Sequence, residues 1–257
     1  MPTFGSLFSG IDGLGLGLQW AGWTPLWHVE NNDFCQDILK QHWPDVPIYG
    51  DITTLDPSSL ERVNLVVGGF PCQPFSHAGR RTAEADDRYL WPHMLRIIRE
   101  LQPTLVLAEN VYGLVTINSG LVLETVYLDL EAAGYEVAPP IVFPAAAVGA
   151  PHRRDRVWIC AHSRHDWGSA EHGQQQEEWT EESYSIYSRT STQHWWITEP
   201  NVDRVVDGFP TPLDKDRAVA ALKALGNAVV PQTAYVIGRA MLESIGELIS
   251  DTSIQVA

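Results

Sequence analysis

The sequence predicts an α/β fold built on a doubly wound, mostly parallel sheet. Short apolar runs at residues 3–8, 25–29 and 65–67 have the length of buried parallel strands. Stretches with apolar residues at helical spacing lie between them, and glycines follow the first and third runs, where a strand would turn into a helix or a loop. Strands and helices that alternate in this way form βα units, whose helices cover both faces of a parallel sheet.

Composition limits the class of the protein. The chain has 257 residues and a formal net charge of -15, and this charge counts against a protein that binds nucleic acid regardless of sequence. Cys35, Cys72 and Cys160 are too widely spaced for a disulfide framework or a zinc site, so we expect a reducing, cytoplasmic setting and no metal. No apolar run is long enough to span a membrane, and the N-terminus lacks the pattern of a signal peptide, which predicts a soluble protein.

The remaining elements follow from periodicity and from residues that cap helices. Asn32 can cap a helix that runs to about residue 43, and an apolar strand at 104–108 ends directly before Glu109. Arg154 and Arg156 alternate on a predicted strand, so both guanidinium groups should point to the same face. In chain order, the other expected elements are a short strand at 46–50, helices at 89–102 and 121–133, a strand at 136–143, and helices at 214–224 and 232–249.

The character of the sequence changes after Ala161. Residues 163–206 are polar and acidic and are rich in Gln, Glu, Ser and Trp, which favours a small inserted region over a continuation of the sheet. We therefore expect three segments: a first domain at 1–162, the insert at 163–206, and a C-terminal segment at 207–257 that returns to the first domain.

The glycine-rich turn at residues 9–17 has the outline of a nucleoside-cofactor site, because glycines allow a ligand to approach the backbone closely. The same pattern also occurs where a helix merely packs on a sheet. Glu30 follows the turn by about 20 residues, where an acidic side chain can accept hydrogen bonds from ribose hydroxyl groups. Asp12 inside the turn would repel a diphosphate and favours a cofactor without phosphates. Asp51 could accept a hydrogen bond from an adenine amino group or could cap a turn.

Cys72 follows the apolar strand at 65–67 and is flanked by Pro71 and Pro74, which restrict the backbone around it. A stiff turn at the end of a strand suits a nucleophile, although a buried structural cysteine is the more common role for a single cysteine. Glu109 ends the next expected strand, and the carboxyl ends of parallel strands meet at one crevice. The two side chains can therefore face the same substrate.

Several motifs, taken in order, resemble those of the DNA cytosine-5 methyltransferases. The resemblance covers residues 1–161 and about 222–233, and it is most specific in the Pro-Cys-Gln, Glu-Asn-Val and Gly-Asn segments. It implies a Rossmann-like methyltransferase sheet that binds S-adenosyl-L-methionine, with a target-recognition region inserted at 163–206. The matching motifs are Phe8-Ser9-Gly10-Ile11, Glu30, Gly50-Asp51-Ile52, Pro71-Cys72-Gln73-Pro74-Phe75-Ser76, Glu109-Asn110-Val111, Arg154-Asp155-Arg156 and Gly226-Asn227-Ala228-Val229-Val230-Pro231.

The resemblance also implies a role for individual residues in the cofactor site. Phe8 would pack on the adenine, and Gly10 would approach the methionine part. Glu30 would bind the ribose, while Asp51 and Ile52 would hold the adenine. By this resemblance, the cofactor-binding residues are Phe8, Gly10, Ile11, Glu30, Asp51, Ile52, Pro71, Leu90, Asn227 and Val229.

For the reaction, the resemblance implies that Cys72 adds to carbon 6 of cytosine and so activates carbon 5. Glu109 would contact N3 and the exocyclic amine. Arg156 would bind O2 and, together with Arg154, would favour the thiolate and hold Glu109. The cytosine must be flipped out of double-stranded DNA, and residues 76–88 would close over it. The expected DNA contacts are Gln73, Ser76, Arg80 and Arg81.

The sequence departs from the family pattern in two places. His152 stands where glutamine is usual before the arginines, and the insert is short and acidic for a region that reads bases in the major groove. Three alternatives stay open: a tRNA cytosine-5 methyltransferase, whose usual Cys-Phe-Thr segment is absent from this sequence; a non-catalytic DNA-binding relative; and a nicotinamide-dependent dehydrogenase, in which Cys72 and Glu109 would have no role. The compact insert is compatible with a solitary enzyme of a bacterium or phage, and we expect a monomer.

Overall fold

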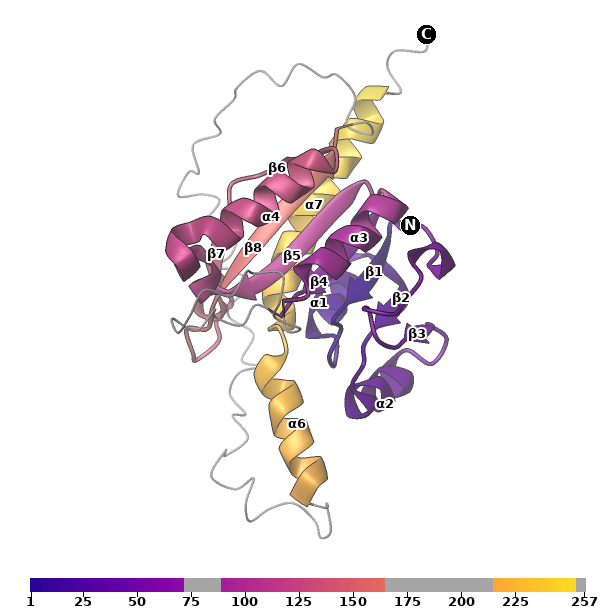
Figure 1. Cartoon of the computed structure of the whole chain (residues 1–257), viewed down its shortest axis with the longest axis vertical. Coiled ribbons are helices and arrows are strands. Elements are labelled where there is room, and N and C mark those ends of the chain that lie inside the picture. The colour runs from indigo at the N-terminus through magenta and orange to yellow at the C-terminus, as the bar shows by residue number, and fades with distance from the viewer. Residues whose placement is uncertain (72–88, 165–214, 253–257) are drawn as a thin grey trace.

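The sheet follows the predicted parallel plan through its first five strands. The computed structural model describes residues 1–71, 89–164 and 215–252. In chain order its strands are β1 (Thr3–Leu7), β2 (Thr24–Val29), β3 (Ile48–Tyr49), β4 (Leu65–Gly69), β5 (Leu105–Val111), β6 (Tyr135–Val137), β7 (Ile141–Pro144) and β8 (Asp155–Ser163). The order in space is β3-β2-β1-β4-β5-β8-β6, and β1 to β5 all pair in parallel (Figure 1). The chain therefore changes direction across the sheet between β1 and β4, which is where doubly wound proteins bind their ligands.

The far edge of the sheet is antiparallel. β8 runs opposite to β5, and β6 and β7 both pair with the remaining side of β8. The prediction of a single strand at 136–143 is therefore wrong. Pro139 and Pro140 separate the two strands, because a proline has no backbone N–H to donate to a neighbouring strand.

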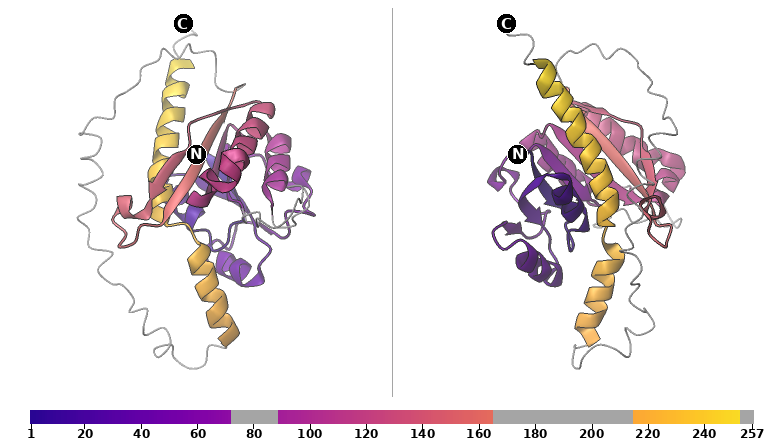
Figure 2. Two further views of the ribbon diagram at one scale, coloured as in Figure 1. Left: turned by 60° about the vertical axis from the view of Figure 1, so that its left-hand side comes forward. Right: turned by 180° about the vertical axis from the view of Figure 1, so that it is seen from behind.

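Helices cover the sheet on both faces (Figures 1 and 2). They are α1 (Gly13–Ala21), α2 (Asp33–His42), α3 (Trp91–Leu101), α4 (Leu121–Ala132), α6 (Lys215–Asn227) and α7 (Pro231–Thr252), with short 3-10 helices at Pro57–Ser59, Tyr112–Val115, Ile117–Gly120 and Ala145–Val148. α3 and α4 pack on one face, where Met94 joins Val66 and Val106 in a buried core. α1 and α7 pack on the other face, where Leu18 and Ile237 are buried.

The two ends of the described chain meet where α1 packs against α7. A Cβ at Gly13 would collide with the carbonyl oxygen of Val229, and a Cβ at Gly17 would collide with that of Pro231. Glycine is therefore required at both positions of α1 for this close approach. The contact brings the start of α7 next to the turn that follows β1.

The predicted cap of α2 is present, but α6 ends later than expected. Asn32 caps α2 by accepting a hydrogen bond from the Cys35 N–H at 3.1 Å. α6 runs to Asn227 instead of ending near residue 224, so Gly226 belongs to its last turn. In Figure 1 this helix projects away from the sheet, and its C-terminal end meets the start of α7. Within the described ranges, no helix has the length and apolar composition needed to cross a bilayer.

Candidate active site

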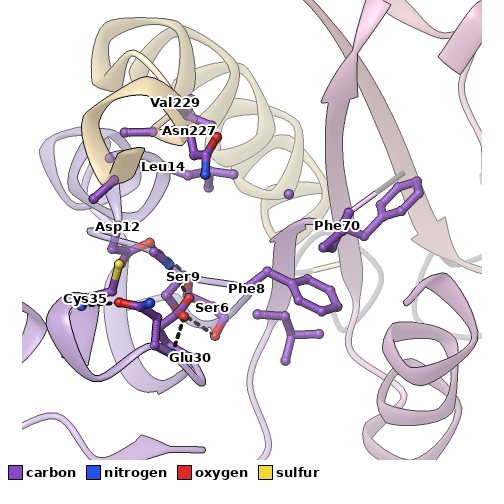
Figure 3. A pocket seen from close by; sticks show the side chains of 18 of the residues that line it. Ser6, Phe8, Ser9, Asp12, Leu14, Glu30, Cys35, Phe70, Asn227 and Val229 are labelled. Carbon is purple, nitrogen blue, oxygen red and sulfur yellow. Dashed lines mark hydrogen bonds between the residues drawn. The ribbon is translucent and has the colours of Figure 1, made fainter. Parts of the chain in front are cut away.

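A cavity of about 1100 Å³ opens at the carboxyl ends of β1, β2, β4 and β5. This volume is sufficient for a nucleotide-sized ligand. Figure 3 shows Glu30 and Ser9 on one wall and Phe8 near the centre, with Asn227 and Val229 on the wall formed by the C-terminal segment. Both ends of the described chain therefore contribute to one cavity.

Glu30 holds the turn after β1 in shape. Phe8 and Gly10 have positive φ angles of 53° and 57°, so the backbone turns sharply at both residues. The Glu30 carboxylate accepts hydrogen bonds from the Gly10 N–H at 2.7 Å and from the Asn32 N–H at 2.8 Å. A carboxylate offers about four lone-pair positions, so Glu30 keeps capacity for hydroxyl groups of a ligand.

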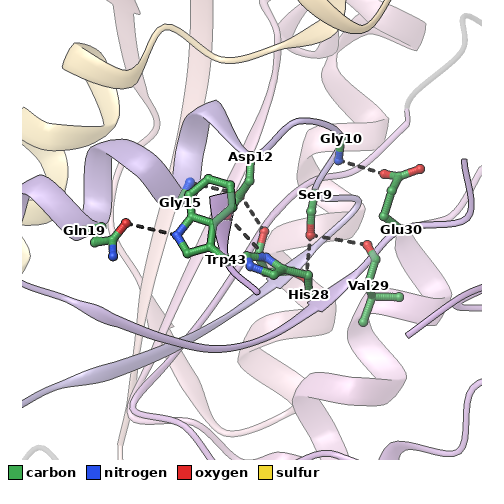
Figure 4. Close-up of polar contacts among 10 residues, drawn as sticks. Ser9, Gly10, Asp12, Gly15, Gln19, His28, Val29, Glu30 and Trp43 are labelled. Carbon is green, nitrogen blue, oxygen red and sulfur yellow. Dashed lines mark hydrogen bonds and ion pairs between the residues drawn. The ribbon is translucent and has the colours of Figure 1, made fainter. Parts of the chain in front are cut away.

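Asp12 caps the first helix from a buried position (Figure 4). Its Oδ1 accepts hydrogen bonds from the Ser6 hydroxyl at 2.9 Å and from the Gly15 N–H at 3.0 Å, and its Oδ2 lies 3.3 Å from His28 Nδ1. Burial raises the pKa of Asp12, and the neighbouring His28 opposes that shift. The carboxylate thus holds the turn in shape from inside.

The predicted cofactor residues converge on the cavity, with the exception of Ile11. Asp51 lies exposed at the rim, where its Oδ1 accepts a hydrogen bond from the Thr53 N–H at 2.8 Å. This hydrogen bond lowers the pKa of Asp51, and it forms the turn that was the alternative prediction. Ile52 is buried and contributes an apolar wall. The predicted residues that line the cavity are Phe8, Gly10, Glu30, Asp51, Ile52, Pro71, Leu90, Asn227 and Val229.

Glu109, which is buried, and Arg156, which is partly buried, form an ion pair in the cavity wall. β5 and β8 pair with Val111 opposite Arg156, which places Glu109 diagonally beside the arginine on the same face. Arg156 Nε lies 2.8 Å from Glu109 Oε1, and Glu109 is 7% exposed. Burial raises the pKa of Glu109 to about 7, while Arg156 and Arg154 oppose the shift. The site therefore holds a carboxyl group that can carry a proton near neutral pH beside a permanent cation.

Arg154 does not share the strand of Arg156. β8 begins at Asp155, and Arg154 has a positive φ of 40°. Its Nη2 donates to the carbonyl oxygens of Gly226 and Ala228, each at 2.7 Å. The prediction that Arg154 lies on the strand with Arg156 is therefore wrong, because the backbone at Arg154 is left-handed and its side chain reaches the end of α6.

Asn110 contributes to the site although sequence reasoning assigned it no role. Its Nδ2 donates to the Phe70 carbonyl at 2.8 Å, and its Oδ1 accepts from the Val111 N–H at 2.9 Å. The residue is buried, and it connects the end of β5 with the chain that leaves β4. The available signal was a polar amide at the end of an apolar strand, directly after Glu109.

Part of the predicted site lies outside the described residues. It comprises Cys72, Gln73, Ser76, Arg80 and Arg81, together with the remainder of the loop at 76–88 and most of the insert at 163–206. The structure does describe the end of β4, which lies just before Cys72 in the chain. β4 ends at Gly69, paired with Glu109, and the Phe70 ring packs on Trp91 with a centroid separation of 5.2 Å. Among the residues with described positions, no three His, Cys, Asp or Glu side chains are grouped as a metal site would require.

Comparison with known proteins identifies the family. A family model described as C-5 cytosine-specific DNA methylase matches residues 2–202, which is well over half of the chain. The chain belongs to the C-5 cytosine-specific DNA methylase family. This membership confirms the resemblance seen in the order of the motifs.

Curated proteins are similar to this methylase family member over about 60% of the chain. The type II methyltransferase M.PspPI of Psychrobacter sp. is 36% identical over 156 residues, which cover 60% of this chain and 38% of that protein. The type II methyltransferase M.HgiCII of Herpetosiphon aurantiacus is 38% identical over 160 residues, which cover 61% of this chain and 36% of that protein. The chain therefore spans well under half the length of these relatives.

A solved structure is similar to the chain in fold. The crystal structure of a Spodoptera frugiperda DNMT2 mutant matches it with a TM-score of 0.56 at 20% sequence identity, over 69% of this chain and 54% of that chain. At this level of identity the likeness establishes the fold alone. The prediction of a Rossmann-like methyltransferase fold for this C-5 cytosine methylase family member is thereby confirmed.

Proposed function

We propose that this family member is a DNA cytosine-5 methyltransferase. It would transfer a methyl group from S-adenosyl-L-methionine to carbon 5 of a cytosine flipped out of double-stranded DNA. The observation that carries the proposal is the ion pair of the buried Glu109 with Arg156, which lies in the cavity wall beside the strand that leads to Cys72. A protonated carboxyl next to a guanidinium matches the polar edge of cytosine, because both can donate hydrogen bonds to its ring nitrogen and carbonyl oxygen.

The cavity walls suit S-adenosyl-L-methionine in shape and charge. Phe8 and Ile52 provide apolar surface for a purine, and Glu30 keeps hydrogen-bonding capacity for the ribose hydroxyl groups. Asp51 adds a second carboxylate at the rim, and acidic walls favour a ligand that carries positive charge. When bound, the cofactor would supply an electrophilic methyl group on a sulfonium centre.

Cys72 would act as the nucleophile toward the base. Its thiolate sulfur would form a bond to carbon 6, and the electron pair of the 5,6 double bond would become available at carbon 5. After carbon 5 has received the methyl group, a base such as a water molecule would take its proton, the electron pair of that C–H bond would form the 5,6 double bond again, and the sulfur would leave carbon 6 as a thiolate. Cys72 would then be free for the next turnover.

Glu109 would hold a proton at N3 of the cytosine. Addition of sulfur to carbon 6 places negative charge on the ring, and a hydrogen bond from a protonated carboxyl group relieves it. Burial keeps the pKa of Glu109 at about 7, so this proton is available near neutral pH. Arg156 would donate to O2 and, through its 2.8 Å contact, would fix the orientation of Glu109.

Double-stranded DNA would be the substrate of a monomeric enzyme in the cytoplasm of a bacterium or of a phage-infected cell. Because the net charge is -15, phosphate contacts must come from local positive side chains and not from the overall field. We propose that the loop at 76–88 and the insert at 163–206 supply them. The proposed DNA contacts are Gln73, Ser76, Arg80 and Arg81.

The test is expression in a bacterium that lacks DNA methylation, followed by mapping of 5-methylcytosine in both genomic DNA and tRNA. The wild type should methylate cytosines of DNA within a defined sequence, and Cys72→Ala should leave the DNA unmodified. Cys160→Ala is the matched control, because Cys160 lies outside the cavity lining, and it should retain activity. Glu109→Gln should lower the rate by about a hundredfold or more, as expected when a general acid is lost.

The other outcomes point to specific alternatives. A folded wild type that binds S-adenosyl-L-methionine but modifies neither nucleic acid would contradict the proposal and favour a non-catalytic relative. Methylated tRNA with unmodified DNA would favour a tRNA methyltransferase. Binding of NAD in place of S-adenosyl-L-methionine would favour a dehydrogenase.

A further inference from the structure

Arg154 links the cytosine side of the cavity with its opposite wall. The residue directly precedes β8, the strand on which Arg156 pairs with Glu109. Its guanidinium nevertheless reaches the C-terminal end of α6, where Nη2 lies 2.7 Å from the Gly226 oxygen and 2.7 Å from the Ala228 oxygen. Arg154 therefore contacts a segment that is distant in the sequence.

The end of α6 has a physical need for such a donor. The last carbonyl groups of a helix have no partner within the helix, and they carry a partial negative charge. Arg154 brings both an N–H donor and a full positive charge to this end, so it acts as a C-terminal cap from another part of the fold. Hydrogen bonds from a charged donor are stronger than those between neutral groups.

The capped segment forms one wall of the cavity. Residues 226–229 all line it, and Figure 3 shows Asn227 and Val229 across the opening from Glu30 and Ser9. Glu30 belongs to the part of the cavity that we assign to the ribose. A displacement of the segment would therefore change the space available to the cofactor.

α6 contacts α2 and buries Ala224, but its larger apolar side chains pack little against the rest of the fold. Val219, Leu222 and Leu225 are 64%, 51% and 63% exposed, and Figures 1 and 2 show the helix projecting from the rest of the molecule. Val229 is fixed separately, because its carbonyl oxygen packs directly against Gly13 on α1. The position of residues 226–228 therefore depends on the hydrogen bonds from Arg154 more than on burial.

We propose that Arg154 is a positioning residue for the cofactor, which holds residues 226–228 against the S-adenosyl-L-methionine site. The inference rests on the proposed function, because it concerns the same cofactor. It replaces the expected role of Arg154 beside the Cys72 thiolate. If Arg154 has this role, its loss must weaken cofactor binding even in the absence of DNA.

The test compares the dissociation constants of S-adenosyl-L-homocysteine, measured by isothermal titration calorimetry without DNA. Arg154→Ala should weaken binding by about tenfold or more, because two charge-assisted hydrogen bonds are lost. Arg154→Lys keeps the charge and can restore a hydrogen bond, so its loss should be smaller. Arg153→Ala is the matched control, because Arg153 is exposed and pairs with Asp155, and it should bind like the wild type.

Steady-state methylation separates this role from a catalytic one. For Arg154→Ala, the KM for S-adenosyl-L-methionine should rise by the same factor as the dissociation constant. The kcat at saturating cofactor should stay within about twofold of the wild type. A role beside the thiolate would instead lower kcat.

Equal dissociation constants for the wild type and Arg154→Ala would overturn the inference, and so would a lower kcat with an unchanged KM. If circular dichroism shows that Arg154→Ala does not fold, the comparison of Arg154→Lys with Arg153→Ala decides the question on the same two measurements. A wild type that fails to bind S-adenosyl-L-homocysteine would count against the proposed function instead. The two failures are therefore distinguishable.

Discussion

Glu109 shows how burial and a neighbouring cation compete at the scale of one residue. Burial removes water from its carboxylate and raises its pKa from 4.5 to about 7, although Arg156 lies only 2.8 Å away. The desolvation of the carboxylate is therefore the larger of the two effects. The folded protein keeps a proton on Glu109 over a pH range in which an ordinary glutamate has lost it.

The shift predicts that the stability contributed by Glu109 depends on pH. The pKa of Glu109 is higher in the folded state than in the unfolded state. The stabilisation is therefore fully present below pH 4.5 and is lost as the pH rises through about 7. The loss amounts to about 3 kcal/mol at most. Urea unfolding of the wild type and of Glu109→Gln at about pH 5 and about pH 8 measures it, and the wild type should lose stability relative to the variant at the higher pH. If the wild type and Glu109→Gln differ in unfolding free energy by the same amount at both pH values, the pKa of Glu109 is not raised by folding.

Asn110 should matter for stability because it satisfies a buried carbonyl. Asn110→Asp keeps an acceptor for the Val111 N–H but places a carboxylate oxygen against the Phe70 carbonyl. We expect a loss of about 1–3 kcal/mol in the free energy of unfolding, measured with urea. Val111→Ala is a suitable control, because this neighbouring side chain is exposed and its loss should cost less than about 0.5 kcal/mol. Equal stability of Asn110→Asp and the wild type would show that another donor reaches the Phe70 carbonyl.

At the scale of elements, the contact between α1 and α7 aligns two parts of the cavity at once. α1 begins directly after the turn that contains Gly10 and Asp12, and α7 begins directly after the segment at 226–230. Pro231 opens α7 at the first helical position, where its missing N–H has no intrahelical partner to lose. One helix pairing therefore sets the distance between the glycine turn and the C-terminal wall.

Gly17→Ala tests this contact. In an isolated helix the change would be favourable by about 1 kcal/mol, because alanine is the better helix former. In this protein a Cβ at Gly17 would collide with the Pro231 carbonyl oxygen, and overpacking of this kind typically costs about 1–3 kcal/mol. We expect lower stability in urea and weaker binding of S-adenosyl-L-homocysteine. Gly50→Ala, where a Cβ would meet open space, should not lower the stability, and a stable, tightly binding Gly17→Ala would contradict the role of the contact.

Most elements could be predicted because each has a local signal in the sequence. The cap at Asn32 and the apolar run at 104–108 are examples, and both appear where they were expected. The break at Pro139 and Pro140 was also visible in the sequence, but the surrounding apolar residues outweighed it in the prediction of one strand. The end of α6 was placed too early, because a glycine such as Gly226 often ends a helix, whereas here the helix continues through it.

At the scale of the whole molecule, one face of the sheet is completed from the far end of the chain. Leu18 and Trp23 share a buried cluster with Ile237 and Met241 of α7. The Trp23 indole N–H also donates to the Gly238 carbonyl at 3.0 Å. The N-terminal half of the sheet therefore has an incomplete core until α7 has packed on it.

A chain that stops after Asn227 should consequently fail to fold cooperatively. Removal of α7 exposes several apolar side chains, each worth about 1.5–3 kcal/mol when buried, and their sum is comparable to the whole stability of a domain, about 5–15 kcal/mol. Thermal unfolding followed by circular dichroism should show no sharp transition. A chain that stops after Thr252 is the control and should unfold like the full protein. A sharp transition in the shorter chain would show that the sheet is stable without α7.

The convergence of the cavity residues could in part be predicted from the sequence, but several of their connections could not. Glu109 and Arg156 meet because β5 and β8 are neighbours, and the arrangement of parallel strands made a shared crevice at Glu109 predictable. Arg154 turns toward α6 because of a left-handed backbone that has no local signature at an arginine. Likewise, the contact of the buried Asp12 with His28 comes from the neighbouring strand β2 and has no local signal in the sequence.

The docking of α7 on α1 depends on proximity in space and not on the direction from which the polypeptide arrives. A circular permutant in which residues 215–252 preceded Thr3, joined through a linker, would bring the same atoms to the same cavity. The order of the motifs along the chain therefore reflects how the elements are connected, and the same site could form with the motifs in a different order.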